Sequence, residues 1–263
     1  MLGMRMPNPP SSLFVGSLAK GLKILRAFDS SETELALSEL VRKTGLDKNS
    51  VQRLANTLYL EGFLYKDELS RRFRPSLAWL ELANAYYWSD PLVALAMPKL
   101  IDLSRELGET VNLARLTQAH VIYVFRLPTT KSRFPATIAG SKLPALGTAS
   151  GRAMLATWEK DARDSALQDW PLRAATPATI LDRTRIAEDV ASAARDGYSI
   201  TYDQAMVNEI SIAAPIRNQA GYAVAAVQCS VSRLNWQPDQ IATKIVPALT
   251  TTANSILDPL RAE

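Results

Sequence analysis

Residues 36–75 carry the pattern that decides the fold of the first part of the chain: ALSELVRKTGLDKNSVQRLANTLYLEGFLYKDELSRRFRP. Apolar residues at helical spacing predict two helices, the second over residues 48–61, with Gly45 in the tight turn between them. Two short strands follow between residues 63 and 74, with arginines near the tip of their hairpin. Such an arrangement places one helix in the DNA major groove beside a basic wing, so the segment predicts a winged helix-turn-helix.

Six polar and basic side chains of this segment are candidates for contact with DNA. The first turns of a recognition helix meet the base edges. Amide side chains there can read adenine, and an arginine can read guanine or hold a phosphate. Arginines on the wing can hold phosphates as well. The candidates are Asn49, Ser50, Gln52, Arg53, Arg71 and Arg72. The alternative is that they form an ordinary solvated polar face.

The net charge of +4 is concentrated in this part of the chain. Residues 1–75 contain 12 Lys/Arg and 8 Asp/Glu, whereas the remainder contains 18 of each. A local excess of positive charge attracts DNA because phosphate contacts release condensed counterions. An excess of this size can also arise by chance, so the charge supports the helix-turn-helix pattern without replacing it.

Composition argues against several other classes of protein. With one cysteine, Cys229, and one histidine, His120, the chain has too few ligands for a disulfide framework or a typical zinc site. No apolar run approaches the ~18 residues of a membrane span. The amino-terminal residues also lack the apolar core of a signal peptide. We therefore expect a cytoplasmic protein with no metal, cofactor or membrane partner.

The 263 residues are enough for about two domains. We expect a DNA-binding domain over residues 1–75, linker helices over residues 76–107 and a second domain over residues 108–263. The linker is strongly apolar, so it packs either on its own domain or against a second copy of the chain. We expect the pairing surface to include Leu80, Tyr86, Tyr87 and Trp88.

The second domain mixes strands and helices. An antiparallel sheet with helices on one side fits the order of the segments, and the chain as a whole reads as α+β. One helix begins after Gly147 among small residues. Its free backbone N–H groups can bind a carboxylate or phosphate, or the small residues can allow close packing on the sheet. Strands are predicted over residues 110–116, 120–127, 198–203, 210–218 and 222–230.

Several segments, in this order, resemble the IclR-type bacterial transcription regulators. They are SLAKGLKILRAF (17–28), LSELVRKTGLDKNSVQRLANTL (37–58), GSKLPALGTASGRAMLA (140–156) and DGYSITYD (196–203). The resemblance implies a winged helix-turn-helix, a linker helix and an effector-binding domain similar to GAF and PAS folds, with an antiparallel sheet and flanking helices. It also implies homodimers, often paired into tetramers, that control operons for small carboxylic acids or aromatic compounds.

The resemblance further implies an effector pocket. Its residues fall at a helix start, in the strand after the DGYS-like motif and in the last two strands: Ala149, Ser150, Gly151, Thr201, Ser211, Gln228 and Ser230. Because this set contains no lysine or arginine, we expect neutral donors to hold an anionic ligand. The chain departs from the family pattern at Asn208, which lies near the usual position of a glycine.

The sequence as a whole predicts a regulator that binds double-stranded operator DNA, senses a small aliphatic or aromatic carboxylate and controls a catabolic operon. One alternative is an enzyme of the same architecture that processes a small acid with Ser150 or Ser211. The single histidine and the absence of a nucleophile-elbow motif argue against it. Another alternative is a DNA-binding protein whose second domain only oligomerises.

Overall fold

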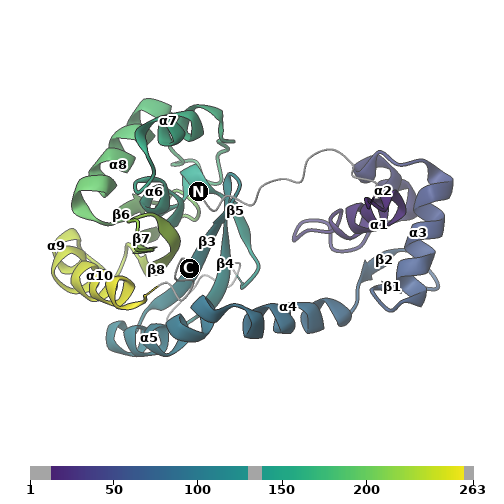
Figure 1. Ribbon diagram of the computed structural model, residues 1–263, viewed down its shortest axis with the longest axis horizontal. Coiled ribbons are helices and arrows are strands. Elements are labelled where there is room, and N and C mark those ends of the chain that lie inside the picture. Colours follow the sequence, from purple (N-terminus) through teal and green to yellow (C-terminus); the bar gives the residue numbers. More distant parts are fainter. Residues whose placement is uncertain (1–12, 130–137, 258–263) are drawn as a thin grey trace. The chain divides into compact units, whose positions relative to one another are not determined.

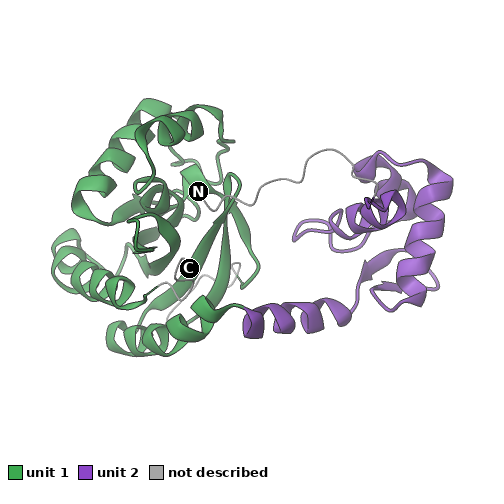
Figure 2. Ribbon diagram, viewed as in Figure 1, with its two compact units in different colours: residues 1–4, 90–263 green, residues 5–89 purple. Residues whose placement is uncertain are grey.

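A computed structural model describes residues 13–129 and 138–257, and the chain divides into two compact units (Figures 1 and 2). The boundary lies between Ser89 and Asp90. It falls inside the segment predicted as linker helices, so that one of those helices belongs to each unit. Within the described ranges, no helix combines the length and the apolar character needed to span a membrane.

The amino-terminal unit contains three helices, a two-stranded hairpin and a fourth helix. Local signals set the ends of these elements. Helix α3 begins after Asp47, whose side chain accepts a hydrogen bond from the Ser50 amide at 2.8 Å. Helix α2 ends at Gly45, which has a positive φ of 65°. The elements are α1 (Gly16–Leu25), α2 (Leu37–Thr44), α3 (Lys48–Leu60), β1 (Leu64–Lys66), β2 (Phe73–Pro75) and α4 (Ala78–Ser89).

Apolar residues of the three helices form the core of this unit, together with Leu35 and Phe73. These two residues also exchange backbone hydrogen bonds of 2.9 and 2.8 Å, which join the segment before α2 to the hairpin. The hairpin is therefore fixed at its base to the helices by packing and by backbone pairing. This is the winged helix-turn-helix that the sequence predicts.

The carboxy-terminal unit is built on a six-stranded antiparallel sheet with the strand order β5-β4-β3-β8-β7-β6. Its strands are β3 (Thr110–Thr117), β4 (His120–Leu127), β5 (Lys142–Pro144), β6 (Ser199–Tyr202), β7 (Glu209–Arg217) and β8 (Ala223–Ser232). Its helices are α5 (Pro91–Leu107), α6 (Ala149–Leu155), α7 (Lys160–Asp169), α8 (Arg183–Asp196), α9 (Pro238–Gln240) and α10 (Val246–Ser255), with short η1 (Ala145–Gly147) and η2 (Ile241–Ile245).

Helices cover both faces of this sheet (Figure 1). Helix α6 packs on β7 and β8, with α7 and α8 outside it, whereas α5 and α10 cover the opposite face. The prediction of helices on one side was therefore wrong. The reason is that α5, which the sequence assigned to the linker, buries Leu92, Leu100 and Leu103 in this unit.

Helix α6 approaches its surroundings so closely that only glycine fits at position 151. A Cβ atom there would lie 2.1 Å from the carbonyl oxygen of Ala145. The Gly151 amide donates to the Thr148 side chain at 3.0 Å, which caps the helix. The small residues at this helix start thus serve close packing, which is one of the two interpretations that the sequence left open.

Arg152 of α6 is the largest fully buried side chain of the described residues, with an exposed fraction of 1%. Its guanidinium donates to the Leu146 carbonyl at 2.8 Å, to Asp189 of α8 at 2.7 Å and to Gln204 at 3.4 Å. Burial lowers the pKa of Arg152, and the charge of Asp189 opposes that effect. One buried cation therefore ties α6 to α8 and to the loop between β6 and β7.

We expect Arg152→Ala to lower the free energy of unfolding by about 3–5 kcal/mol, because it breaks a buried, hydrogen-bonded ion pair. The matched control is Arg185→Ala. Arg185 approaches the same Asp189 carboxylate at 3.8 Å but is 63% exposed, so the expected loss is under about 0.5 kcal/mol. Urea denaturation followed by circular dichroism gives both values. Equal losses for the two variants would contradict the assigned role of Arg152.

Candidate DNA-binding and effector-binding sites

The first turns of α3 present polar side chains to solvent. Asn49, Gln52 and Arg53 are exposed, and Ser50 is half-buried beside the helix cap. Val51 lies on the opposite face and is fully buried in the core. The structure therefore brings the predicted base-reading residues together on the outer face of α3, where they can reach the edges of base pairs.

The two wing arginines have different surroundings in the structure, although the sequence predicted the same phosphate-binding role for both. Arg71 is exposed at the turn, with a positive φ of 58°, and its side chain forms no hydrogen bond or ion pair with any described residue. Arg72 is half-buried, and its Nη2 donates to Glu39 Oε2 at 2.7 Å and to the Glu34 carbonyl at 2.8 Å. Its charge is thus neutralised within the protein, which argues against the prediction that Arg72 holds a phosphate.

The Glu39 carboxylate is hydrogen-bonded both to the wing and to the start of α2. Its Oε2 also accepts a hydrogen bond from the Ala36 amide at 2.7 Å, at the start of α2. This hydrogen bond and the charge of Arg72 lower the pKa of Glu39. The arrangement fixes the wing relative to the helix-turn-helix, and it suits Arg72 to positioning the wing and Arg71 to contacting a phosphate.

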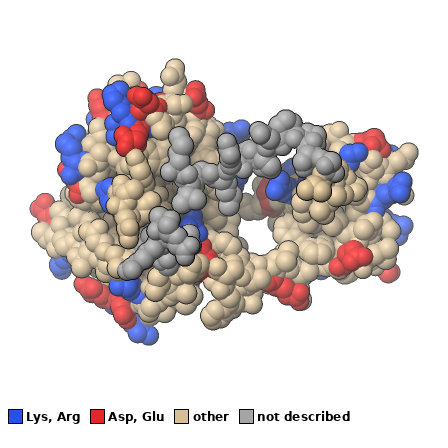
Figure 3. Space-filling view, in the orientation of Figure 1, with Lys and Arg blue, Asp and Glu red and all other residues tan. Residues whose placement is uncertain are grey.

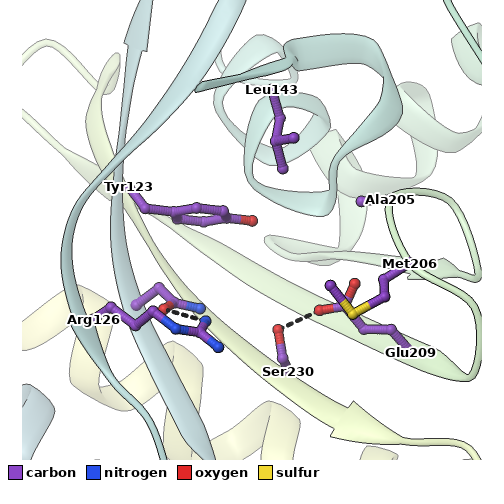
Figure 4. A pocket seen from close by; sticks show the side chains of 8 residues that line it. Tyr123, Arg126, Leu143, Ala205, Met206, Glu209 and Ser230 are labelled. Carbon is purple, nitrogen blue, oxygen red and sulfur yellow. Dashed lines mark hydrogen bonds between the residues drawn. The ribbon is translucent and has the colours of Figure 1, made fainter. Parts of the chain in front are cut away.

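The carboxy-terminal unit contains a cavity of about 180 Å³ (Figure 4). Asn112 of β3 is one of its lining residues and pairs across the sheet with Gln228, which in turn pairs with Ala213. Cross-strand partners share a face, and Ala213 packs against Ala149 of α6. The cavity therefore lies on the α6 face of the sheet. Its lining residues are Asn112, Tyr123, Arg126, Leu143, Ala205, Met206, Glu209 and Ser230.

A chain of side-chain hydrogen bonds crosses the sheet beneath this cavity. Arg126 Nη1 on β4 donates to Asn112 Oδ1 on β3 at 3.1 Å. Asn112 Nδ2 donates in turn to Gln228 Oε1 on β8. Gln228 Nε2 then donates to the hydroxyls of Ser211 and of Ser230, the latter at 2.7 Å. These polar residues come from strands far apart in the sequence, and the register of the sheet brings them together.

The hydrogen-bonded chain ends on Glu209, at the start of β7. The Ser230 hydroxyl donates to Glu209 Oε1 at 2.5 Å. Burial raises the pKa of Glu209, while the Ser230 hydrogen bond and the charge of Arg126 act in the opposite direction. Burial lowers the pKa of Arg126, although a guanidinium stays protonated in proteins. The cavity therefore has a cationic group on β4 and a carboxyl group on β7.

The loop between β6 and β7 forms one edge of the cavity and is held by its own contacts. Asp203 accepts a hydrogen bond from the Asn208 amide at 2.6 Å and pairs with Arg233. Asn208 has a φ of 64°, in the left-handed region that glycine and asparagine tolerate best. This conformation explains how asparagine can stand near the usual position of a glycine. The fixed loop presents Ala205 and Met206 to the cavity.

The structure separates the predicted effector residues into three groups. Ser230 lines the cavity, Gln228 is hydrogen-bonded to it from behind, and Ser211 accepts a hydrogen bond from Gln228 without lining the cavity. Thr201 is buried on β6 as the cross-strand partner of Ser211 and does not line the cavity. The remaining three are fully buried in α6 and do not line it either: Ala149, Ser150 and Gly151.

Sequence reasoning missed the cavity residues that carry charge. Arg126 is the one charged residue of the strand HVIYVFRL, and Asn112 is an isolated polar residue in TVNLARL. A polar residue within an apolar strand indicates a buried polar interaction. This pattern was sufficient to select Arg126 and Asn112 as candidates. Glu209 gave no such signal, because it stands at the beginning of its strand, where charged residues are common.

Comparison with known proteins identifies the family of the chain. The family model described as the C-terminal domain of the bacterial transcriptional regulator IclR matches residues 85–257, and the IclR helix-turn-helix domain matches residues 17–68. The p-hydroxybenzoate hydroxylase transcriptional activator of Acinetobacter baylyi is 26% identical over 248 residues, which cover 92% of this chain and 91% of that protein.

Two further comparisons support the same family. The transcriptional repressor IclR of Escherichia coli is 30% identical over 230 residues, which cover 86% of this chain and 84% of the repressor. The crystal structure of a transcriptional regulator from Rhodococcus sp. RHA1 has 30% identity and a TM-score of 0.79, and the match covers 92% of this chain and 97% of that one. The resemblance predicted from the sequence is thereby confirmed: this chain belongs to the IclR family of transcriptional regulators, which join a helix-turn-helix DNA-binding domain to an effector-binding domain.

Proposed function

We propose that this regulator controls a catabolic operon in response to a small carboxylate that binds beside Arg126. The observation that carries the proposal is the guanidinium of Arg126 in the wall of the cavity. The planar fork of an arginine matches a carboxylate and forms strong, charge-assisted hydrogen bonds with it. In this proposal Arg126 holds the carboxylate of the ligand, whereas the sequence analysis expected neutral hydrogen-bond donors to hold it.

The remaining wall of the cavity suits an apolar body on the ligand. Leu143, Ala205 and Met206 contribute aliphatic surface, and the Tyr123 ring adds an aromatic face with a hydroxyl at its edge (Figure 4). Apolar walls with a few convergent polar groups are usual in sites for small molecules. The name of the Acinetobacter relative refers to p-hydroxybenzoate, an aromatic carboxylate, which supports this class of ligand.

The contacts of the two serines favour a regulator over an enzyme. The Ser211 hydroxyl accepts a hydrogen bond from Gln228, and Ser150 is fully buried in α6. Within the described ranges, neither hydroxyl is hydrogen-bonded to a histidine or a carboxylate that could act as a general base. We therefore propose a cytoplasmic, non-enzymatic sensor, in agreement with relatives that are transcriptional regulators.

We also propose that the regulator is at least a dimer, paired through α4. This helix has no buried residue, and Leu80 and Trp88 are 67% and 81% exposed. Trp79 packs against the amino-terminal core, where its Nε1 donates to the Phe63 carbonyl at 2.9 Å. Glu81 is the one charged residue of α4, so its surface is otherwise uncharged (Figure 3). Contiguous exposed apolar surface of this kind marks protein interfaces.

The effector assignment predicts that Arg126→Gln weakens the binding of benzoate at least about tenfold, because a charge-assisted hydrogen bond is lost. DNA affinity without ligand should not change. Calorimetric titration of the full chain measures the first quantity, and a fluorescence-anisotropy assay measures the second. The matched control is Arg217→Gln on the exposed end of β7, which should leave both unchanged. If no acid from a panel of aliphatic and aromatic carboxylates binds the wild-type protein, the effector assignment fails.

The two wing arginines should differ in the salt dependence of DNA binding. Loss of a phosphate contact in Arg71→Ala should lower the slope of log K against log salt by about 1 per wing. Arg72→Ala should weaken binding with little change in slope, because Glu39 already neutralises that charge. Binding is measured on DNA from the region upstream of the gene. Equal flattening by both variants would instead assign a phosphate contact to Arg72.

The proposed pairing surface predicts a change of mass in solution. The double variant Leu80→Glu and Trp88→Glu should shift the protein toward a smaller species, because two like charges would face their counterparts in a two-fold interface. Light scattering at micromolar concentration gives the mass. Leu69→Glu is the control, since Leu69 is also exposed but lies on the wing. A monomeric wild-type protein would refute the proposal.

A further inference from the structure

The polar outer face of α3 extends one turn beyond the candidate residues taken from the sequence. Residues at positions i, i+3, i+4 and i+7 share one face of a helix. Four exposed polar side chains of α3 have this spacing: Asn49, Gln52, Arg53 and Asn56. Their face lies opposite Val51 and Ala55, which are buried in the core. The surface that α3 can offer to DNA is therefore two turns long.

The fold makes no use of the three amide side chains on this face. Asn49, Gln52 and Asn56 form no side-chain hydrogen bond with any residue that the structure describes. The neighbouring Thr57 differs, because its hydroxyl donates to the Arg53 carbonyl at 3.0 Å. Asparagine destabilises a helix interior relative to alanine, since its side chain competes for backbone groups. Asn56 thus weakens α3 slightly and leaves both its donor and its acceptor available to a ligand.

We propose that Asn56 is a further base-reading residue and that the amides of α3 select adenines. Adenine presents an N7 acceptor and an N6 donor in the major groove, and one amide group matches both. Arg53 is the one cation among the four side chains, and its fork matches the two acceptors of guanine. This inference concerns the sequence of the operator. It goes beyond the proposed function and does not depend on the identity of the effector.

The length of the face sets the number of base pairs that it reads. Asn49 and Asn56 are seven positions apart in the sequence, which is about 10 Å along a helix at about 1.5 Å per residue. Base pairs stack at about 3.4 Å, so the two asparagines are about three steps apart on DNA. Arg53 lies between them. We therefore expect a core of about four base pairs, with an adenine toward each end and a guanine between.

Selection from a random duplex library with the full chain tests the proposal. Wild type should enrich a motif that contains this core. Asn56→Ala should lose the preference for adenine at one end of the core and keep the rest of the motif. The variant should fold, because alanine is the better residue at an exposed position inside a helix. Thr57→Ala is the matched control, and its motif should be that of wild type.

A modified base tests the contact itself. 7-Deazaadenine still pairs with thymine but lacks the N7 acceptor. At the position assigned to Asn56 in the selected duplex, it should weaken wild-type binding at least about fivefold, the lower end of the discrimination that a good amide–adenine pair provides. It should not weaken binding by Asn56→Ala further, since that variant has already lost the contact. Fluorescence anisotropy at one fixed salt concentration gives the affinities.

Three results would overturn the proposal. If Asn56→Ala selects the same motif as wild type, α3 reads bases with its first turns alone. A core made only of G·C pairs would contradict the selection of adenine by the amides. A library from which wild type enriches no motif would contradict base reading by this face altogether. None of these results bears on the effector assignment, because the binding of acids beside Arg126 is measured without DNA.

Discussion

The buried guanidinium of Arg152 is the interaction on which the effector-binding unit depends most. It joins α6 to α8 through Asp189 and to the loop after β6 through Gln204. Gln204 in turn donates to the carbonyls of Ala178 and Tyr202, both at 2.9 Å. A buried charge is tolerated only where such partners satisfy it. The same contacts fix the loop that presents Ala205 and Met206 to the cavity. The hydrogen bonds that offset the desolvation of Arg152 therefore also hold one edge of the cavity in place.

The sheet contributes to the site through its register. Asn112, Arg126, Glu209 and Ser230 lie on four strands, and their alternation places them all on the α6 face. A shift of one residue in any pairing would turn a polar side chain into the layer that α5 and α10 cover. The buried hydrogen bonds therefore specify the register of the sheet as well as the lining of the cavity, because a slipped strand would leave several polar groups without partners.

The parts of the fold that follow local rules could be predicted from the sequence. Helix α3 was predicted over residues 48–61 and spans Lys48–Leu60, because the Asp47 cap and the Gly62 stop are both local signals. The pairing of Arg72 with Glu39 joins residues 33 positions apart, and no local pattern indicates it. The family pattern named seven candidate effector residues, of which Ser230 lines the cavity. It could not show which side chains line a cavity, because that depends on packing across the sheet.

Strand β3 connects the cavity with the point where the chain enters the effector-binding unit. Asn112 lines the cavity, and Arg115, three residues later on the same strand, pairs with Asp90, the first residue of the unit. Asp90 is buried and also caps α5 by accepting a hydrogen bond from the Leu92 amide at 3.0 Å. A ligand shifts a conformational equilibrium only by its different affinity for the two states. Arg126 is hydrogen-bonded to Asn112, so strand β3 carries side chains that are paired with the cavity wall on one side and with Asp90 on the other.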